Sequence, residues 1–88
     1  MLNTTIEISN YPLTEDYENQ ILDFIERVSS HSGIKVKVNA TSTHITGEFG
    51  TVFTVLQQEI HSSYEKYGQM IFVIKVLKGA LDLNYESK

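Results

Sequence analysis

The order of hydrophobic patterns along the chain predicts an α+β fold of the ferredoxin-like type. Short stretches that alternate apolar and polar residues indicate strands, and two longer stretches with apolar residues every three or four positions indicate amphipathic helices. Their order is strand, helix, strand, strand, helix, strand (βαββαβ), which is that of the split βαβ motif. Because such crossovers are right-handed, we expect two helices on one face of a four-stranded antiparallel sheet with strand order 4-1-3-2.

The N-terminal part of the chain predicts one strand and one helix. In residues 4–10, Ile6 and Ile8 alternate with polar residues, which is typical of a strand with one buried face. Thr14 precedes two acidic residues and is expected to be the N-cap of a helix over residues 15–31. The apolar stripe of this helix consists of Tyr17, Ile21, Phe24, Ile25 and Val28.

A pair of strands is predicted next. Gly33 is expected to end the first helix, because glycine is favoured just beyond a helix C-terminus. Residues 34–38 alternate isoleucine or valine with lysine, which predicts a second strand at an edge of the sheet. Residues 39–41 break this period and predict a turn. A third strand follows and ends near Phe49 and Gly50.

The C-terminal part predicts a second helix and a last strand. The helix covers residues 51–67 and ends at Gly68. Residues 70–77 form a strand that is apolar on both faces, and we expect a neighbouring subunit or the tail at residues 79–85 to cover it. The apolar stripe of the second helix consists of Phe53, Leu56, Ile60, Tyr64 and Tyr67.

Size and composition limit the classes of function. The chain has 88 residues, which predicts a single domain over residues 1–88, small enough to favour oligomerisation. Its net charge of −4 argues against nucleic acid or an anionic membrane as partner, and it contains no cysteine. Residues 1–5 contain neither a basic segment nor an apolar core, so we expect a cytoplasmic protein.

The third strand is unusually polar, and its chemistry points to a binding surface. Alternation places Thr43, Ile45 and Gly47 on one face of it. A polar face of this kind fits a small heteroaromatic ligand, a solvated sheet surface or a subunit interface. On the other face, beside the polar residues of the first strand, we expect Ser42, His44, Thr46 and Glu48 next to Thr5, Glu7 and Ser9.

Enzymatic and cofactor-dependent functions find little support in the sequence. His44 is a conceivable general base, but no nucleophile or paired acid stands at a catalytic spacing from it. The loop at residues 10–14 lacks the arginine that ferredoxin-like acylphosphatases use to hold a phosphoryl group. Three scattered histidines make no metal site. We therefore expect no enzyme activity, no cofactor and no bound metal.

Three segments of the chain carry a resemblance to a known family. Residues 6–13, 39–48 and 72–76 resemble the YkoF-like family of thiamine and hydroxymethylpyrimidine binding proteins. This resemblance implies a ferredoxin-like subunit that pairs its sheet with a second copy and binds an aminopyrimidine without chemistry. It also implies that the ligand contacts Glu7, Ser9, Ser42 and Thr43, to which we add Asn39 and Phe49.

The leading hypothesis is therefore a non-enzymatic binding protein for thiamine or its hydroxymethylpyrimidine moiety, assembled as a homodimer or homotetramer. A structural or regulatory oligomerisation module without a ligand is the main alternative. An enzyme that uses His44 as a base in a cleft between subunits is the third.

Overall fold

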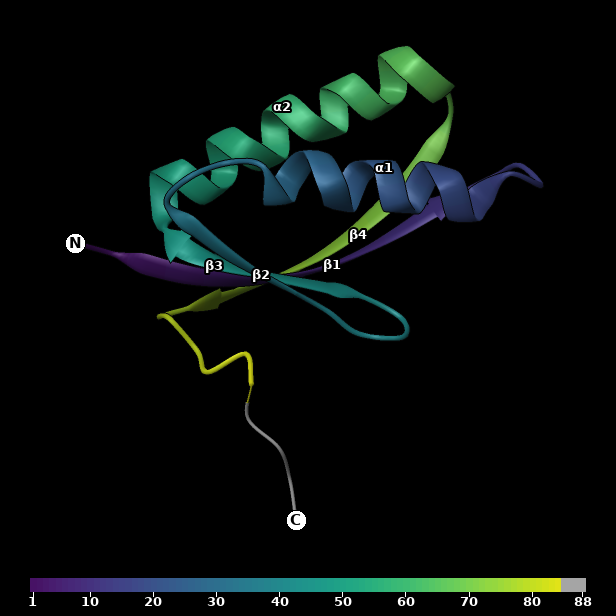
Figure 1. The fold of residues 1–88 in the computed structure, drawn as a ribbon. Helices are drawn as coiled ribbons and strands as arrows, with labels where there is room; N and C mark the ends of the chain where they lie inside the picture. The colour runs from purple at the N-terminus through teal and green to yellow at the C-terminus, as the bar shows by residue number, and fades with distance from the viewer. Residues whose placement is uncertain (85–88) are drawn as a thin grey trace.

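Two helices cover one face of a four-stranded antiparallel sheet in the structure, a computed structural model that describes residues 1–84 (Figure 1). The sheet order, β2-β3-β1-β4, confirms the predicted order read from the other edge. The prediction of a single domain over the whole chain stays a prediction. The elements are β1 (Asn3–Pro12), α1 (Tyr17–Ser29), β2 (Ile34–Val38), β3 (Thr43–Glu48), α2 (Phe49–Tyr67) and β4 (Met70–Lys78).

The register between the central strands β1 and β3 confirms the predicted division of faces. Glu7 stands opposite His44, and Thr5 stands opposite Thr46, so these polar residues share the helix-free face. Ile6 stands opposite Ile45 on the face that the helices cover. The pairing brings together polar residues from distant parts of the chain, as the period of two predicts.

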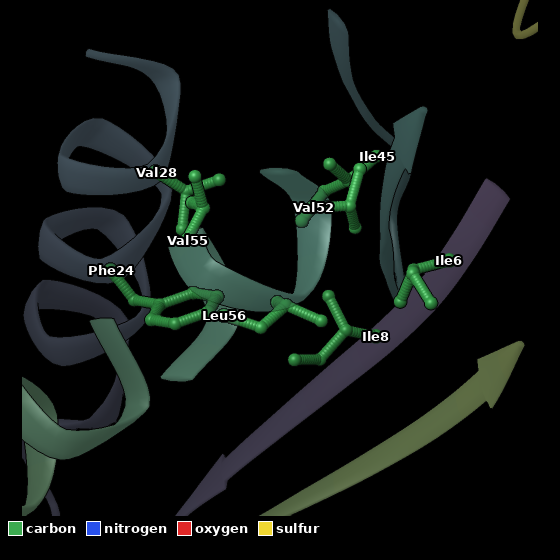
Figure 2. Close-up of a cluster of buried hydrophobic side chains, with 8 residues drawn as sticks. All are labelled: Ile6, Ile8, Phe24, Val28, Ile45, Val52, Val55 and Leu56. Carbon is green, nitrogen blue, oxygen red and sulfur yellow. The ribbon is translucent and has the colours of Figure 1, made fainter. Parts of the chain in front are cut away.

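The hydrophobic core lies between this sheet face and the helices (Figure 2). Phe24 and Val28 point from α1 toward the sheet, because they are four positions apart on one face of the helix. Burial of these apolar side chains holds the two layers together. The cluster consists of Ile6, Ile8, Phe24, Val28, Ile45, Val52, Val55 and Leu56.

The start of α1 differs from the prediction. The helix begins at Tyr17, and its N-cap is Asp16, so the prediction of Thr14 as N-cap is wrong. The Thr14 hydroxyl instead accepts a hydrogen bond of 2.9 Å from Gln20 Nε2. That bond gives a partner to the amide nitrogen of Gln20, whose side chain is only 7% exposed. Tyr17, which was expected in the apolar stripe, is 50% exposed. The helix also ends at Ser29, and Gly33, with a φ of 82°, lies in the turn before β2.

The start of α2 uses a residue that we expected on the polar strand face. Glu48 is the N-cap of α2, and its carboxylate accepts hydrogen bonds from the backbone N–H groups of Gly50, at 2.9 Å, and Thr51, at 3.0 Å. These bonds lower the pKa of Glu48 below its ordinary value. The expectation that Glu48 belongs to the binding face is therefore wrong. The predicted end of the helix at Gly68 is confirmed.

The segment after β4 turns onto the helix-free face of the sheet (Figure 1). Its backbone binds the Thr5 hydroxyl, which donates to the Gly79 carbonyl at 2.9 Å and accepts from the Leu81 N–H at 3.0 Å. Thr5 and Thr46 are buried as a result. The described part of the tail, residues 79–84, leaves β4 uncovered, because Val73 and Val76 are 53% and 54% exposed. Tyr85, the last residue of the predicted tail, lies outside the described residues.

A network of charged side chains joins the two helices. Arg27 of α1 donates to Asp23 Oδ2 at 3.1 Å and to Glu59 Oε1 at 2.7 Å, and it also binds the hydroxyl of Ser63, which is fully buried. Burial raises the pKa of Glu59, but hydrogen bonds from His31 and Arg27 outweigh it and lower that pKa below 4.5. Burial also raises the pKa of Asp23, but the hydrogen bonds to this carboxylate outweigh burial and lower the pKa below 3.8.

This network predicts loss of stability in acid. A carboxyl whose pKa is lowered by folding stabilises the native state above its unfolded pKa, and this contribution disappears as the pH falls through the folded value. We expect the free energy of unfolding to fall below about pH 4.5, which urea denaturation at a series of pH values measures. Glu59→Gln is expected to flatten this fall. An equal fall in the wild type and the variant would contradict the assignment.

Candidate functional site

The structure divides the six predicted site residues between two faces of the sheet and one separate position. Asn39, Ser42 and Thr43 line a small pocket between α1 and the β2–β3 hairpin. Glu7 lies on the helix-free face, where Asn39 also takes part in a second cavity. Ser9 and Phe49 line neither of these two cavities. A wider, open cavity of about 800 Å³ between β2 and the tail contains none of the six.

The pocket between α1 and the hairpin combines an apolar wall with a polar end. Its volume is about 100 Å³. The apolar wall comes from α1, where Phe24 faces the sheet and its ring lies 5.1 Å from the ring of Phe72. The hairpin supplies the polar end, and its bend is closed by a hydrogen bond of 2.8 Å from Asn39 N–H to the Ser42 carbonyl. The hairpin residues of the pocket are Val38, Asn39, Ala40, Thr41, Ser42 and Thr43.

Asn10 also lines this pocket, and the sequence analysis did not select it. It follows Ile6 and Ile8 on β1 at the same period, and it lies beside Phe24 in the lining of the pocket. Its side-chain oxygen and nitrogen are both buried, and neither has a hydrogen-bond partner among residues 1–84. The sequence contains a signal for Asn10: the period of two predicts an apolar residue at position 10, and asparagine is polar.

A second cluster lies on the helix-free face. The Asn39 amide donates to His44 Nδ1 at 2.8 Å, and His44 Nε2 donates to Glu7 Oε2 at 3.0 Å. Lys75 lies 3.3 Å from the other oxygen of Glu7. The hydrogen bonds from His44 and then Lys75 lower the pKa of Glu7 below its ordinary value. This cluster lines a cavity of about 390 Å³, whose other wall includes Leu81 of the tail.

The remaining predicted residues take part in local packing. The Ser9 hydroxyl donates to the Thr41 carbonyl at 3.3 Å, so it supports the hairpin from the strand beside it. Phe49 is partly exposed at the start of α2, and its ring lies 4.8 Å from the ring of Phe53. The Phe49 N–H donates to the Leu2 carbonyl at 2.9 Å. Phe49 is therefore not brought together with the other five residues.

The two clusters differ in what they offer a ligand. On the helix-free face, both ring nitrogens of His44 already have partners, and so does each oxygen of Glu7. In the pocket, the amide of Asn10 has none among the described residues. Buried polar groups in native proteins are nearly always paired. The pocket is thus the place where a bound molecule would supply missing hydrogen bonds, and a flat ring fits its apolar wall.

Solved structures of similar fold come from bacteria and archaea. One, from Thermotoga maritima and described as a candidate thiamine biosynthesis or salvage protein, has a TM-score of 0.80 and 19% identity, covering 92% of this chain and 90% of its own. A hypothetical protein from Methanocaldococcus jannascii has a TM-score of 0.76 and 17% identity, covering 100% and 89%. A domain of unknown function from Bacillus cereus has a TM-score of 0.70 and 25% identity, covering 84% and 73%.

Sequence comparison identifies the family. Comparison with curated proteins gives no significant match. The profile of the YkoF-related family matches residues 3–79, which include every helix and strand. Neither helix among the described residues is long and apolar enough to cross a membrane. The match extends over most of the chain and agrees with the resemblance found in the three sequence segments, so the protein belongs to the YkoF-related family.

Proposed function

We propose that this protein binds thiamine or its hydroxymethylpyrimidine moiety in the pocket between α1 and the β2–β3 hairpin. The observation that carries this proposal is the composition of the pocket, which the hydroxyl residues Ser42 and Thr43 of the hairpin line together with an apolar wall from α1. Membership in the YkoF-related family and the thiamine-related description of the Thermotoga maritima protein support it.

The size of the pocket and the charge of the protein indicate how the ligand would lie. A pocket of about 100 Å³ admits one substituted ring rather than both rings of thiamine. The pyrimidine would enter, with its polar substituents near the hydroxyls of Ser42 and Thr43. The cationic thiazolium would stay outside, where the net charge of −4 favours it. Glu7 does not line this pocket, so its role as a ligand contact stays a prediction.

Isothermal titration with thiamine and with hydroxymethylpyrimidine tests the proposal. Thr43→Val keeps the shape of a buried pocket residue and removes its hydroxyl, so we expect at least about tenfold weaker binding. Thr54→Val, at an exposed position on α2, is the matched control and is expected to bind like the wild type. Absence of heat with both compounds at millimolar concentration would reject the proposal.

We further propose that the protein binds this ligand without transforming it. The arrangement of His44 supports this, because its Nδ1 accepts from Asn39 and its Nε2–H donates to Glu7, which leaves no free nitrogen to act as a base. Mass spectrometry of thiamine and hydroxymethylpyrimidine after prolonged incubation with the protein is expected to show both compounds unchanged. Conversion that His44→Ala abolishes would establish the enzyme alternative instead.

Assembly into a homodimer or homotetramer forms the last part of the proposal. Among the described residues, β4 pairs with β1 alone, and apolar side chains on both of its faces are exposed. A second copy offers an antiparallel strand of equal length and the same apolar character, which would shield this edge. We expect Val76→Lys to shift sedimentation equilibrium toward monomer, whereas Leu22→Lys on the exposed side of α1 does not. A wild-type monomer would contradict this part.

The oligomerisation module remains the second candidate function, and the exposed strand β4 favours it. Its subunit interface would include the polar helix-free face, on which His44 lies. It predicts that His44→Ala on the helix-free face shifts the protein toward monomer while titrations with both compounds stay blank. Binding of either compound by the wild type would show that oligomerisation is not the whole function.

A further inference from the structure

Asn10 has features that a purely structural residue rarely combines. It lies on β1 among residues that face the core, and with Phe24 and Ile21 it lines the pocket between α1 and the hairpin. Its Oδ1 and Nδ2 atoms are buried and have no hydrogen-bond partner among residues 1–84. An amide in this state destabilises the folded chain, and an apolar side chain of similar size would avoid that cost. The arrangement is thus unfavourable until another molecule pairs with the amide.

We infer that Asn10 determines the specificity of the pocket by pairing with the hydrogen-bonding edge of the bound ring. The inference rests on the proposed function and adds to it the chemistry that the pocket selects. The amide presents an acceptor, Oδ1, beside a donor, Nδ2. An aminopyrimidine presents the complementary pair, an amino donor next to a ring-nitrogen acceptor, as adenine does when asparagine recognises it.

The surroundings of Asn10 make this recognition selective. The α1 side of the pocket is apolar and includes Ile21, Phe24 and Ile25. This wall contacts the faces of any flat ring and does not distinguish one ring from another. A ring that lacks the donor and acceptor pair would leave the Asn10 amide buried and unpaired, so it would be rejected. The hydroxyl residues Thr41, Ser42 and Thr43 of the hairpin also line the pocket, and they are candidates for contacts with other substituents of the ring.

Titration of two probes with two variants tests the inference. The probes are hydroxymethylpyrimidine and the same compound without its 4-amino group. The wild type is expected to bind the second probe at least tenfold more weakly. Asn10→Leu is expected to bind the first probe at least tenfold more weakly than the wild type and to lose the discrimination between the probes, because the same pair of bonds is missing. Asn19→Ala, which removes an exposed amide from α1, is the control and is expected to bind like the wild type.

Thermal denaturation without ligand gives an independent readout. Asn10→Leu is expected to raise Tm by about 5 °C, because it removes an unpaired buried amide. A residue that serves only the fold would show the opposite, a lower Tm with unchanged binding, and that result would overturn the inference. If Asn10→Leu does not fold, Asn10→Ala, which is too small to clash, must show the same loss of binding and of discrimination.

The outcomes separate this inference from the proposed function. If the wild type binds hydroxymethylpyrimidine and both Asn10 variants bind it equally well, the inference is overturned and the proposed function stands. If the wild type binds neither hydroxymethylpyrimidine nor thiamine, the proposed function and the inference both fail. Tenfold weaker binding in the variants, together with lost discrimination, supports both.

Discussion

Replacement of Phe24 by alanine is expected to remove about 3–5 kcal/mol from the free energy of unfolding. Phe24 is 1% exposed and lies between α1 and the sheet (Figure 2). Its ring centroid lies 5.1 Å from that of Phe72. Alanine would lose the contacts of the whole ring and would leave a cavity that the β-sheet cannot collapse to fill. A chain of 88 residues has a total stability of about 4–13 kcal/mol, so this loss removes a large share of it.

Urea denaturation followed by circular dichroism measures the effect of Phe24→Ala. Leu22→Ala, on the exposed side of the same helix, is the matched control and is expected to change the stability by less than about 0.5 kcal/mol. Because Phe24 also lines the pocket, the folded fraction of Phe24→Ala is expected to bind hydroxymethylpyrimidine more weakly. A destabilisation below about 1 kcal/mol would show that the ring does not hold the layers together.

Replacement of Arg27 by methionine is expected to cost about 1–3 kcal/mol, the second largest effect. The variant keeps a long apolar side chain but removes the Arg27 partner of Glu59 Oε1, which leaves that carboxylate with His31 as its remaining partner among the described residues, and it leaves the buried Ser63 hydroxyl without its donor. The carboxylate of Glu59 is mostly buried, so water replaces the lost interaction only in part. The packing of α1 against α2 is therefore expected to weaken.

A double-mutant cycle separates the pair of charges from the rest of the network. The coupling energy between Arg27→Met and Glu59→Gln is expected to exceed about 0.5 kcal/mol, because the two side chains interact directly. Lys66→Met removes an exposed cation that pairs with Asp23, and it is expected to leave the stability nearly unchanged, because solvent screens this pair. Additive effects of Arg27→Met and Glu59→Gln would contradict a direct interaction within the folded protein.

The two errors at the helix starts have one origin. Thr14 is a preferred N-cap residue by type and was expected at a cap, whereas Glu48 is not a preferred type and was expected on a strand. In the structure Thr14 binds the side chain of Gln20, whereas Glu48 caps α2. Residue preference pointed away from both outcomes, because the contacts that each side chain makes at the helix start outweigh it.

The candidate site was predicted in part. The hairpin residues Asn39, Ser42 and Thr43 do line a pocket, and the pairing of Glu7 with His44 follows from the strand period. Ser42 was expected on the same face as Glu7, but it lines the pocket together with Thr43, and the sheet separates this pocket from Glu7. Asn10 could not be selected from the strand period alone, because an asparagine near a strand end has many ordinary uses and its lack of partners depends on how its neighbours pack.

The order of elements, the order of strands and most of the residues that share a strand face could be predicted from the amino-acid pattern alone. These depend on periodic patterns within short segments, and a one-residue slip would have turned Ile6 and Ile8 toward solvent. Which polar groups have hydrogen-bond partners, and where a pocket remains, could be learned only from the packed fold. The Thr5 hydroxyl accepts a hydrogen bond from the Leu81 N–H, which is 76 residues away in the chain. The pocket is lined by residues of α1, β1 and the hairpin. Contacts of this kind depend on how whole layers pack, which no local pattern records.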